Sequence, residues 1–197
     1  MSDLIKKIIE DFFDIAIVIF LIFVILLNPY TRPKETIRRG YYSIEKREHR
    51  LLLGITGHTF LELRDENGKV LYQMHGLATD SKTGAWKEIG NMGSEYLRAW
   101  EFDGDKYKTY RDMDIGRTGT QIKIGTKIDI LKDWGNIRSC ALEINQKNIW
   151  YSRYGFNIFS ETENSNSVAH TLIICAEMLD KNVGLFSPGS KTNLLKQ

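Results

Sequence analysis

A cluster of serine and asparagine residues late in the chain could do chemistry because of its position. Residues 163–172 read ENSNSVAHTL, and an apolar repeat begins within them: Val168, Leu172, Cys175 and Leu179. This spacing predicts one buried face of a helix, and Asn or Ser just before such a face caps the free N–H groups of the helix. The same helix end stabilises an anion or a nucleophile. The cluster therefore predicts a helix cap, with a reactive serine as the sharper hypothesis.

Two histidines are expected to meet on one face of a hairpin. Residues 56–63 (TGHTFLEL) and 70–77 (VLYQMHGL) flank Asn67-Gly68, which predicts a type I′ turn with positive φ at both residues. In that register Glu66 faces Lys69, and one face carries the core residues Thr59, Leu61, Leu63, Tyr72 and Met74. The opposite face carries Phe60, Glu62 and Gln73 with His58 and His75, which are diagonal neighbours.

The histidine pair has two plainer interpretations. The two rings could meet by coincidence on a solvent-facing sheet surface. They could also bind a metal with Glu62 or a distant group as the third ligand, although this spacing matches no known metal motif. We predict no metal and no cofactor.

The remaining elements come from shorter patterns. Residues 95–102 and 121–124 are candidate strands, and 128–144 is a candidate amphipathic helix that contains Cys140. The chain has only two cysteines, too few for a disulfide scaffold, and no C-x-x-C pair. Cys140 and Cys175 are therefore interpreted as structural thiols, and the redox compartment stays open.

An apolar segment near the N-terminus predicts a membrane anchor. Residues 12–27 read FFDIAIVIFLIFVILL, and a spanning helix needs about 20 predominantly apolar residues, with about 17 as the lower bound. The mostly apolar approach from Leu4 and the interfacial Tyr30 make the element long enough to span with its polar ends snorkelling. A cleaved signal peptide and a buried core helix are the alternatives. The expected organisation is an anchor at 1–30, a basic linker at 31–49 and a domain at 50–197.

The charges beside the segment give an expected orientation. Lys6 and Lys7 precede it, whereas seven basic residues follow it: Arg32, Lys34, Arg38, Arg39, Lys46, Arg47 and Arg50. The positive-inside rule then favours a single-pass protein with a cytoplasmic C-terminal domain. The basic run could instead lie on anionic lipid headgroups or be an ordinary solvated face.

Composition limits the partners. A chain of 197 residues, 42% hydrophobic, can build one sizeable core and hardly two. Its net charge of +2 gives no reason to expect a nucleic acid. The expected partners are the lipid bilayer and a peptide, peptidoglycan or lipid substrate.

The order of these residues resembles the circularly permuted papain-like hydrolases, which join permuted NlpC/P60 amidases with lecithin:retinol acyltransferase-like proteins. Residues 57–60 (GHTF) look like the histidine strand of that group, His75 occupies the orienting position, and residues 164–168 (NSNSV) look like the nucleophile motif. The resemblance covers about residues 50 to 180. It implies an α+β fold in which an antiparallel sheet packs with helices, here after one N-terminal transmembrane helix.

The resemblance also implies roles for the site residues. Ser165 stands where the family has cysteine, and a serine hydroxyl, unlike a thiol, needs a base during attack. His58 would be that base and His75 would hold its ring. Asn164, Asn166 and Ser167 are secondary candidates, Ser167 as a cap.

Three functions follow as hypotheses. The first is a membrane-anchored hydrolase or acyltransferase-like enzyme that cleaves an amide or ester through Ser165, His58 and His75. The second is an inactive papain-like domain that keeps the groove for binding. The third is an unrelated membrane-anchored interaction protein.

Overall fold

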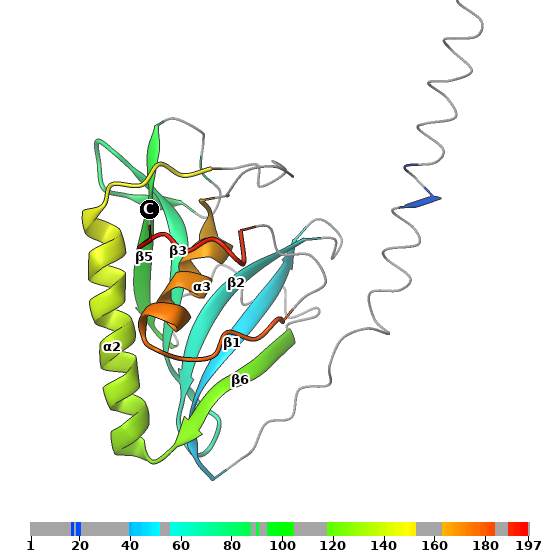
Figure 1. Cartoon of the computed structure of the whole chain (residues 1–197), viewed down its shortest axis with the longest axis vertical. Coiled ribbons are helices and arrows are strands. Elements are labelled where there is room, and N and C mark those ends of the chain that lie inside the picture. The colour runs from blue at the N-terminus through cyan, green and yellow to red at the C-terminus, as the bar shows by residue number, and fades with distance from the viewer. Residues whose placement is uncertain are drawn as a thin grey trace, which may run out of the picture.

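Six strands form one antiparallel sheet in the computed structural model (Figure 1). The structure describes residues 17, 19–20, 40–51, 56–87, 90, 94–104, 118–152, 163–183 and 189–196. The strands are β1 (Tyr42–Leu51), β2 (Thr56–Arg64), β3 (Val70–Asp80), β4 (Trp86–Lys87), β5 (Glu95–Asp103) and β6 (Thr118–Gly125). The helices are α2 (Lys127–Gln146) and α3 (Ser165–Cys175). The predicted α+β class is confirmed.

The strands run in the order β6-β1-β2-β3. Met74 of β3 pairs with Leu61 of β2 and with Glu101 of β5, so β5 lies on the other edge of β3. The short β4 pairs with Ala78 and Thr79, where β5 already occupies one edge. β4 therefore lies on the same edge of β3 as β2, beyond the last pair that β2 and β3 form.

The β2–β3 hairpin confirms the predicted register but not the predicted turn. Phe60 pairs with His75 and Leu61 with Met74, as expected. A bulge between Leu63 and Arg64 shifts the end of the ladder, so that Arg64 pairs with Val70. Of the two turn residues only Gly68 has positive φ (80°), and the type I′ prediction was wrong. The carboxylate of Asp65 instead holds the turn by accepting from the backbone N–H groups of Asn67 and Lys69.

Both helices pack on the same face of the sheet. The shared core joins Leu61, Leu63 and Met74 with Trp134 of α2 and Leu172 of α3, all buried. This is the apolar face that the hairpin predicted, because side chains alternate along a strand. The stripe of α3 ends at Cys175, since Leu179 lies beyond the helix and is 74% exposed.

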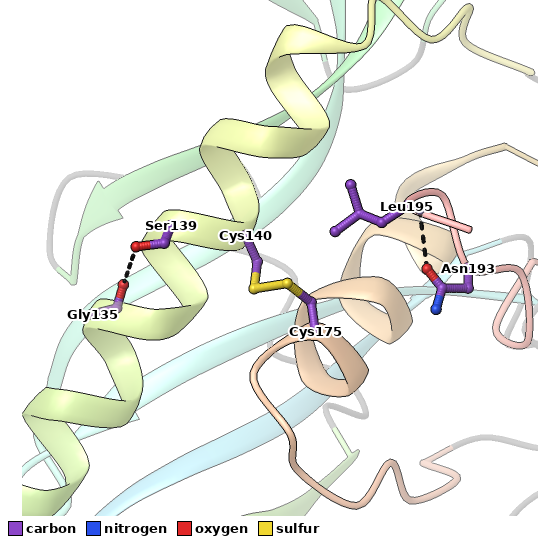
Figure 2. Close-up of a disulfide and its surroundings, with 6 residues drawn as sticks. All are labelled: Gly135, Ser139, Cys140, Cys175, Asn193 and Leu195. Atoms are coloured by element: carbon purple, nitrogen blue, oxygen red, sulfur yellow. Dashed lines mark hydrogen bonds between the residues drawn. A yellow bond between two sulfur atoms is a disulfide. The ribbon is translucent and has the colours of Figure 1, made fainter. Parts of the chain in front are cut away.

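A disulfide joins the two helices (Figure 2). Cys140 in the middle of α2 is bonded to Cys175 at the end of α3, with the two Cα atoms 6.1 Å apart. The interpretation of both residues as thiols was wrong. A spacing of 35 residues between two unrelated helical patterns gave no sign that they would meet.

Most of the predicted membrane anchor lies outside the described residues. The span at 12–27 lies outside the described residues, apart from Ile17, Ile19 and Phe20. No helix among the described residues is long and apolar enough to cross a membrane. The predicted basic linker at 31–49 contains most of β1, which pairs with both β2 and β6. The folded domain therefore begins before residue 50.

Candidate functional site

His58 and His75 meet, as the hairpin predicted, but they do so in the interior. Nε2 of His58 lies 3.0 Å from Nδ1 of His75, and the rings stack with their centroids 5.3 Å apart. Phe60 stacks on His75 at 4.4 Å. The two histidines are only 3% and 1% exposed. The interpretation as a coincidence on a solvent-facing surface was wrong.

A third histidine adjoins this pair. His49 of β1 is the partner of His58 in the ladder, and it is buried as well. Burial, followed by the charge of His49, lowers the pKa of His58 to about 3. The ring of His58 is therefore neutral at pH 7. A general base works best with a pKa near the working pH, so the environment of His58 is poor for that role.

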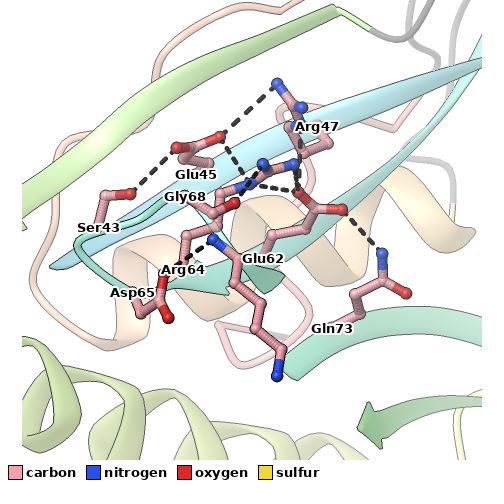
Figure 3. Close-up of polar contacts among 9 residues, drawn as sticks. Ser43, Glu45, Arg47, Glu62, Arg64, Asp65, Gly68 and Gln73 are labelled. Carbon is pink, nitrogen blue, oxygen red and sulfur yellow. Dashed lines mark hydrogen bonds and ion pairs between the residues drawn. The ribbon is translucent and has the colours of Figure 1, made fainter. Parts of the chain in front are cut away.

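Four charged side chains, three of them buried and that of Arg64 partly exposed, continue the same face of the sheet, away from the helices (Figure 3). Arg64 and Arg47 contact Glu62 at 2.6 and 3.2 Å, and both also pair with Glu45 at 3.3 and 3.6 Å. Gln73 donates to Glu62 at 2.8 Å. Burial raises the pKa of Glu45 more than the charge of Arg64 lowers it. Buried charges require this degree of pairing, since an isolated one is strongly destabilising.

The sequence contained no clear signal for this layer. Residues 43, 45, 47 and 49 of β1 are Ser, Glu, Arg and His, but residues 46, 48 and 50 between and after them are charged as well. The stretch therefore lacks the alternation of apolar and polar residues that predicts a half-buried strand, and its net charge predicted a basic linker instead.

Ser165 does not join the histidines. It begins α3, and its Cα lies 2.8 Å from the point where a Cβ atom of Gly76 would stand. Gly76 therefore faces α3, and His75, its neighbour in β3, faces the opposite side. Thr59, the neighbour of His58, likewise bonds to α3. The sheet thus lies between the serine and the histidine pair.

The other residues of the cluster hold the helix in place. Asn164 is the N-cap: its side-chain oxygen accepts from the N–H groups of Asn166 and Ser167, and Ser167 Oγ accepts from the N–H of Asn164. The capping role predicted for Ser167 is confirmed. Asn166 Oδ1 accepts from the backbone N–H and the hydroxyl of Thr59 at 2.7 and 2.9 Å. The start of α3 is thereby joined to β2.

His170, which no sequence pattern indicated as a site residue, has a carboxylate partner. Nδ1 of His170 in α3 lies 2.6 Å from Asp180, and Nζ of Lys46 lies 2.8 Å from the same carboxylate. Burial alone would raise the pKa of Asp180, but the bond from His170 and the charge of Lys46 outweigh it, so the pKa falls below its usual value. These three groups connect β1, α3 and the segment after α3.

No group of three or more His, Cys, Asp or Glu side chains among residues 40–51, 56–87, 94–104, 118–152 and 163–183 could hold a metal ion. A pocket of about 280 Å³ lies between α2 and β5. Its polar lining is already paired, because Arg138 binds Glu101 and Asn145 binds the backbone of Ala99.

Comparison with protein-family models, with curated proteins and with solved structures finds no match.

Proposed function

We propose that the chain is a membrane-anchored protein-binding domain. In this proposal residues 12–27 hold the chain at a bilayer and the folded part binds another protein through α2. This corresponds to the interaction-protein hypothesis from the sequence.

One observation carries the proposal. The solvent side of α2 presents three large apolar side chains, Ile128, Leu131 and Leu142, which are 80%, 39% and 63% exposed. At 3.6 residues per turn they lie within about 60° of one another. The opposite side of α2 is the buried one, with Ile130, Trp134, Ile137 and Ile144 in the core. Leu142 lies about 16 Å further along the helix axis than Leu131, so the three side chains form a stripe along one side of the helix. Exposed apolar residues in such a stripe mark a candidate interaction site.

The charges around these residues favour a protein over an anionic lipid surface. Lys127 and Lys132 are interspersed with Asp129 and Glu143 on the exposed turns of α2. A helix that lies on anionic lipid carries mainly Lys and Arg on its polar face. Mixed charges around an apolar centre are instead the pattern of a protein interface.

The geometry gives less support to hydrolysis. Ser165 and the His58–His75 pair lie on opposite faces of the sheet, and a nucleophile and its base need contact at hydrogen-bond distance or through one water. In addition, a His58 with a pKa of about 3 is a weak proton acceptor at pH 7.

Photocrosslinking of the full chain in its membrane tests the binding surface. A photoreactive phenylalanine analogue would replace Ile128, Leu131 or Leu142 in turn, with Lys82 in the exposed turn after β3 as the matched control position. We expect one discrete protein adduct shared by the three α2 positions and absent at Lys82. Adducts of equal yield at Lys82, or none on α2, would contradict the proposal.

A fluorophosphonate probe tests the competing hydrolase. We expect no labelling of the full chain. Labelling that is lost in Ser165→Ala and kept in Ser81→Ala, a serine in an exposed turn, would restore the hydrolase hypothesis and show that the serine has a base we have not identified.

A further inference from the structure

The Cys140–Cys175 disulfide bears on which side of the membrane the domain lies. The chain has two cysteines in total, and both are in this bond. It connects the middle of α2 to the last residue of α3, so it links the two helices that cover the sheet (Figure 2).

The bond needs an oxidant. Two thiols become one disulfide by giving up two protons and two electrons, which pass by thiol–disulfide exchange to the disulfide of an oxidoreductase and leave that partner as a dithiol. Such oxidised partners belong to secretory and periplasmic compartments. In the cytosol the thioredoxin and glutathione systems keep thiols reduced, and structural disulfides are rare there.

We infer that the domain built from β1 to β6, α2 and α3 lies on the oxidising side of the membrane. The chain would then cross once, with residues 1–11 on the reducing side. This reverses the orientation that the flanking charges favour. The inference rests on the membrane anchor of the proposed function, and it is independent of whether α2 binds a protein.

The structure also weakens the prediction of a cytoplasmic domain that the basic residues after the span gave. Three of the seven basic residues after the span, Lys46, Arg47 and Arg50, belong to β1. Lys46 is paired with Asp180, and Arg47 with Glu62. Without these three, four basic residues follow the span and two precede it. An excess of Lys and Arg determines the orientation of short loops, whereas long folded domains are translocated largely regardless of charge.

The consequence for function is a restriction on partners. A domain on the oxidising side meets exported proteins, outward-facing membrane proteins or cell-wall material. Cytosolic proteins would be out of its reach, whichever surface does the binding.

Sidedness can be measured with single cysteines in the full chain. In a Cys140→Ser/Cys175→Ser background, Lys82→Cys places a thiol in the exposed turn of the domain, and Ser2→Cys places one before the span. Spheroplasts of a bacterial host are treated with a membrane-impermeant maleimide before and after permeabilisation. We expect Lys82→Cys to react in intact spheroplasts and Ser2→Cys to react only after permeabilisation. Because this readout reports location, it holds even if the double variant is unstable.

The native bond is tested in the same host. After acid quenching, alkylation of the natural chain with a polyethylene-glycol maleimide should give no shifted band without reductant and a doubly shifted band after reduction. The inference would be overturned by free cysteines in the unreduced chain, by protection of Lys82→Cys, or by equal labelling of Lys82→Cys and Ser2→Cys in intact spheroplasts.

Discussion

Gly76 and Ser165 are in direct contact between β3 and α3. A Cβ atom on Gly76 would stand 2.8 Å from the Cα of Ser165 and 2.7 Å from the Cβ of Val168, closer than real Cβ atoms approach other carbon atoms. The missing side chain allows the first turn of α3 to lie directly on the strand. The contact leaves no space for a substrate between Ser165 and the sheet at this point.

Replacing Gly76 with alanine should therefore destabilise the fold. The added methyl group meets backbone and a β-branched side chain, neither of which can rotate away, so we expect the free energy of unfolding to fall by about 1–3 kcal/mol. Gly135→Ala is the matched control. Nothing lies within 4 Å of its Cβ position, and alanine in a helix interior should raise stability by about 0.5–1 kcal/mol. Urea unfolding measures both, and equal midpoints for Gly76→Ala and the natural chain would contradict the contact.

The sequence predicted the β2–β3 register because alternation along a strand fixes which side chains share a face. The same alternation predicted that His58 and His75 would meet. It could not tell whether that face was buried, since polar residues on a strand usually face solvent. The burial depends on β1, whose charged residues predicted a linker and not a strand.

The position of Ser165 could not be predicted, for a different reason. A helix start with Asn and Ser shows where α3 begins, but not on which face of the sheet it packs. That choice depends on long-range contacts, such as Gly76 with Val168 and Asn166 with Thr59. The disulfide depends in the same way on how α2 and α3 pack, which no local pattern contains.

The histidine layer should make stability depend on pH. Folded His58 has a pKa of about 3, and an unfolded histidine has a pKa of about 6.5. Between these values the unfolded chain binds a proton that the folded chain does not, so the contribution of His58 is complete above about pH 6.5 and is lost as the pH falls towards 3.

In His58→Gln the group that binds this proton in the unfolded chain is absent. Between about pH 3 and 6.5 the free energy of unfolding of the natural chain should rise with pH more steeply than that of the variant, by up to about 1.4 kcal/mol per pH unit. The two slopes are compared because Glu45, whose pKa is raised in the folded chain, lowers the free energy of unfolding as the pH rises. Urea unfolding from pH 4 to 7 gives both slopes. An NMR titration of the His58 ring with a midpoint near 6.5 would refute the explanation.

The four-charge layer should be sensitive to the loss of one member. Arg64 contacts Glu62 at 2.6 Å and Glu45 at 3.3 Å, and both carboxylates are almost fully buried. Arg64→Met leaves them with Arg47 as the remaining arginine, and removal of one partner from a buried ion pair destabilises by about 3–5 kcal/mol. Arg138→Met is the control, because its pair with Glu101 is partly exposed and should be worth about 1 kcal/mol or less. Similar losses in the two variants would show that the layer is hydrated.

The disulfide should supply a large part of the stability of the helical layer. It closes a loop across 35 residues, and the loss of chain entropy in the unfolded state gives about 4 kcal/mol for a loop of that length. We expect Cys140→Ala/Cys175→Ala to be less stable by about this amount. Dithiothreitol should lower the stability of the natural chain to a similar extent and leave the variant unchanged, which separates the effect of the bond from that of the altered side chains. If reductant moves neither unfolding curve, the helices are held by their packing against Leu61, Leu63 and Met74 of the sheet, and the bond adds little.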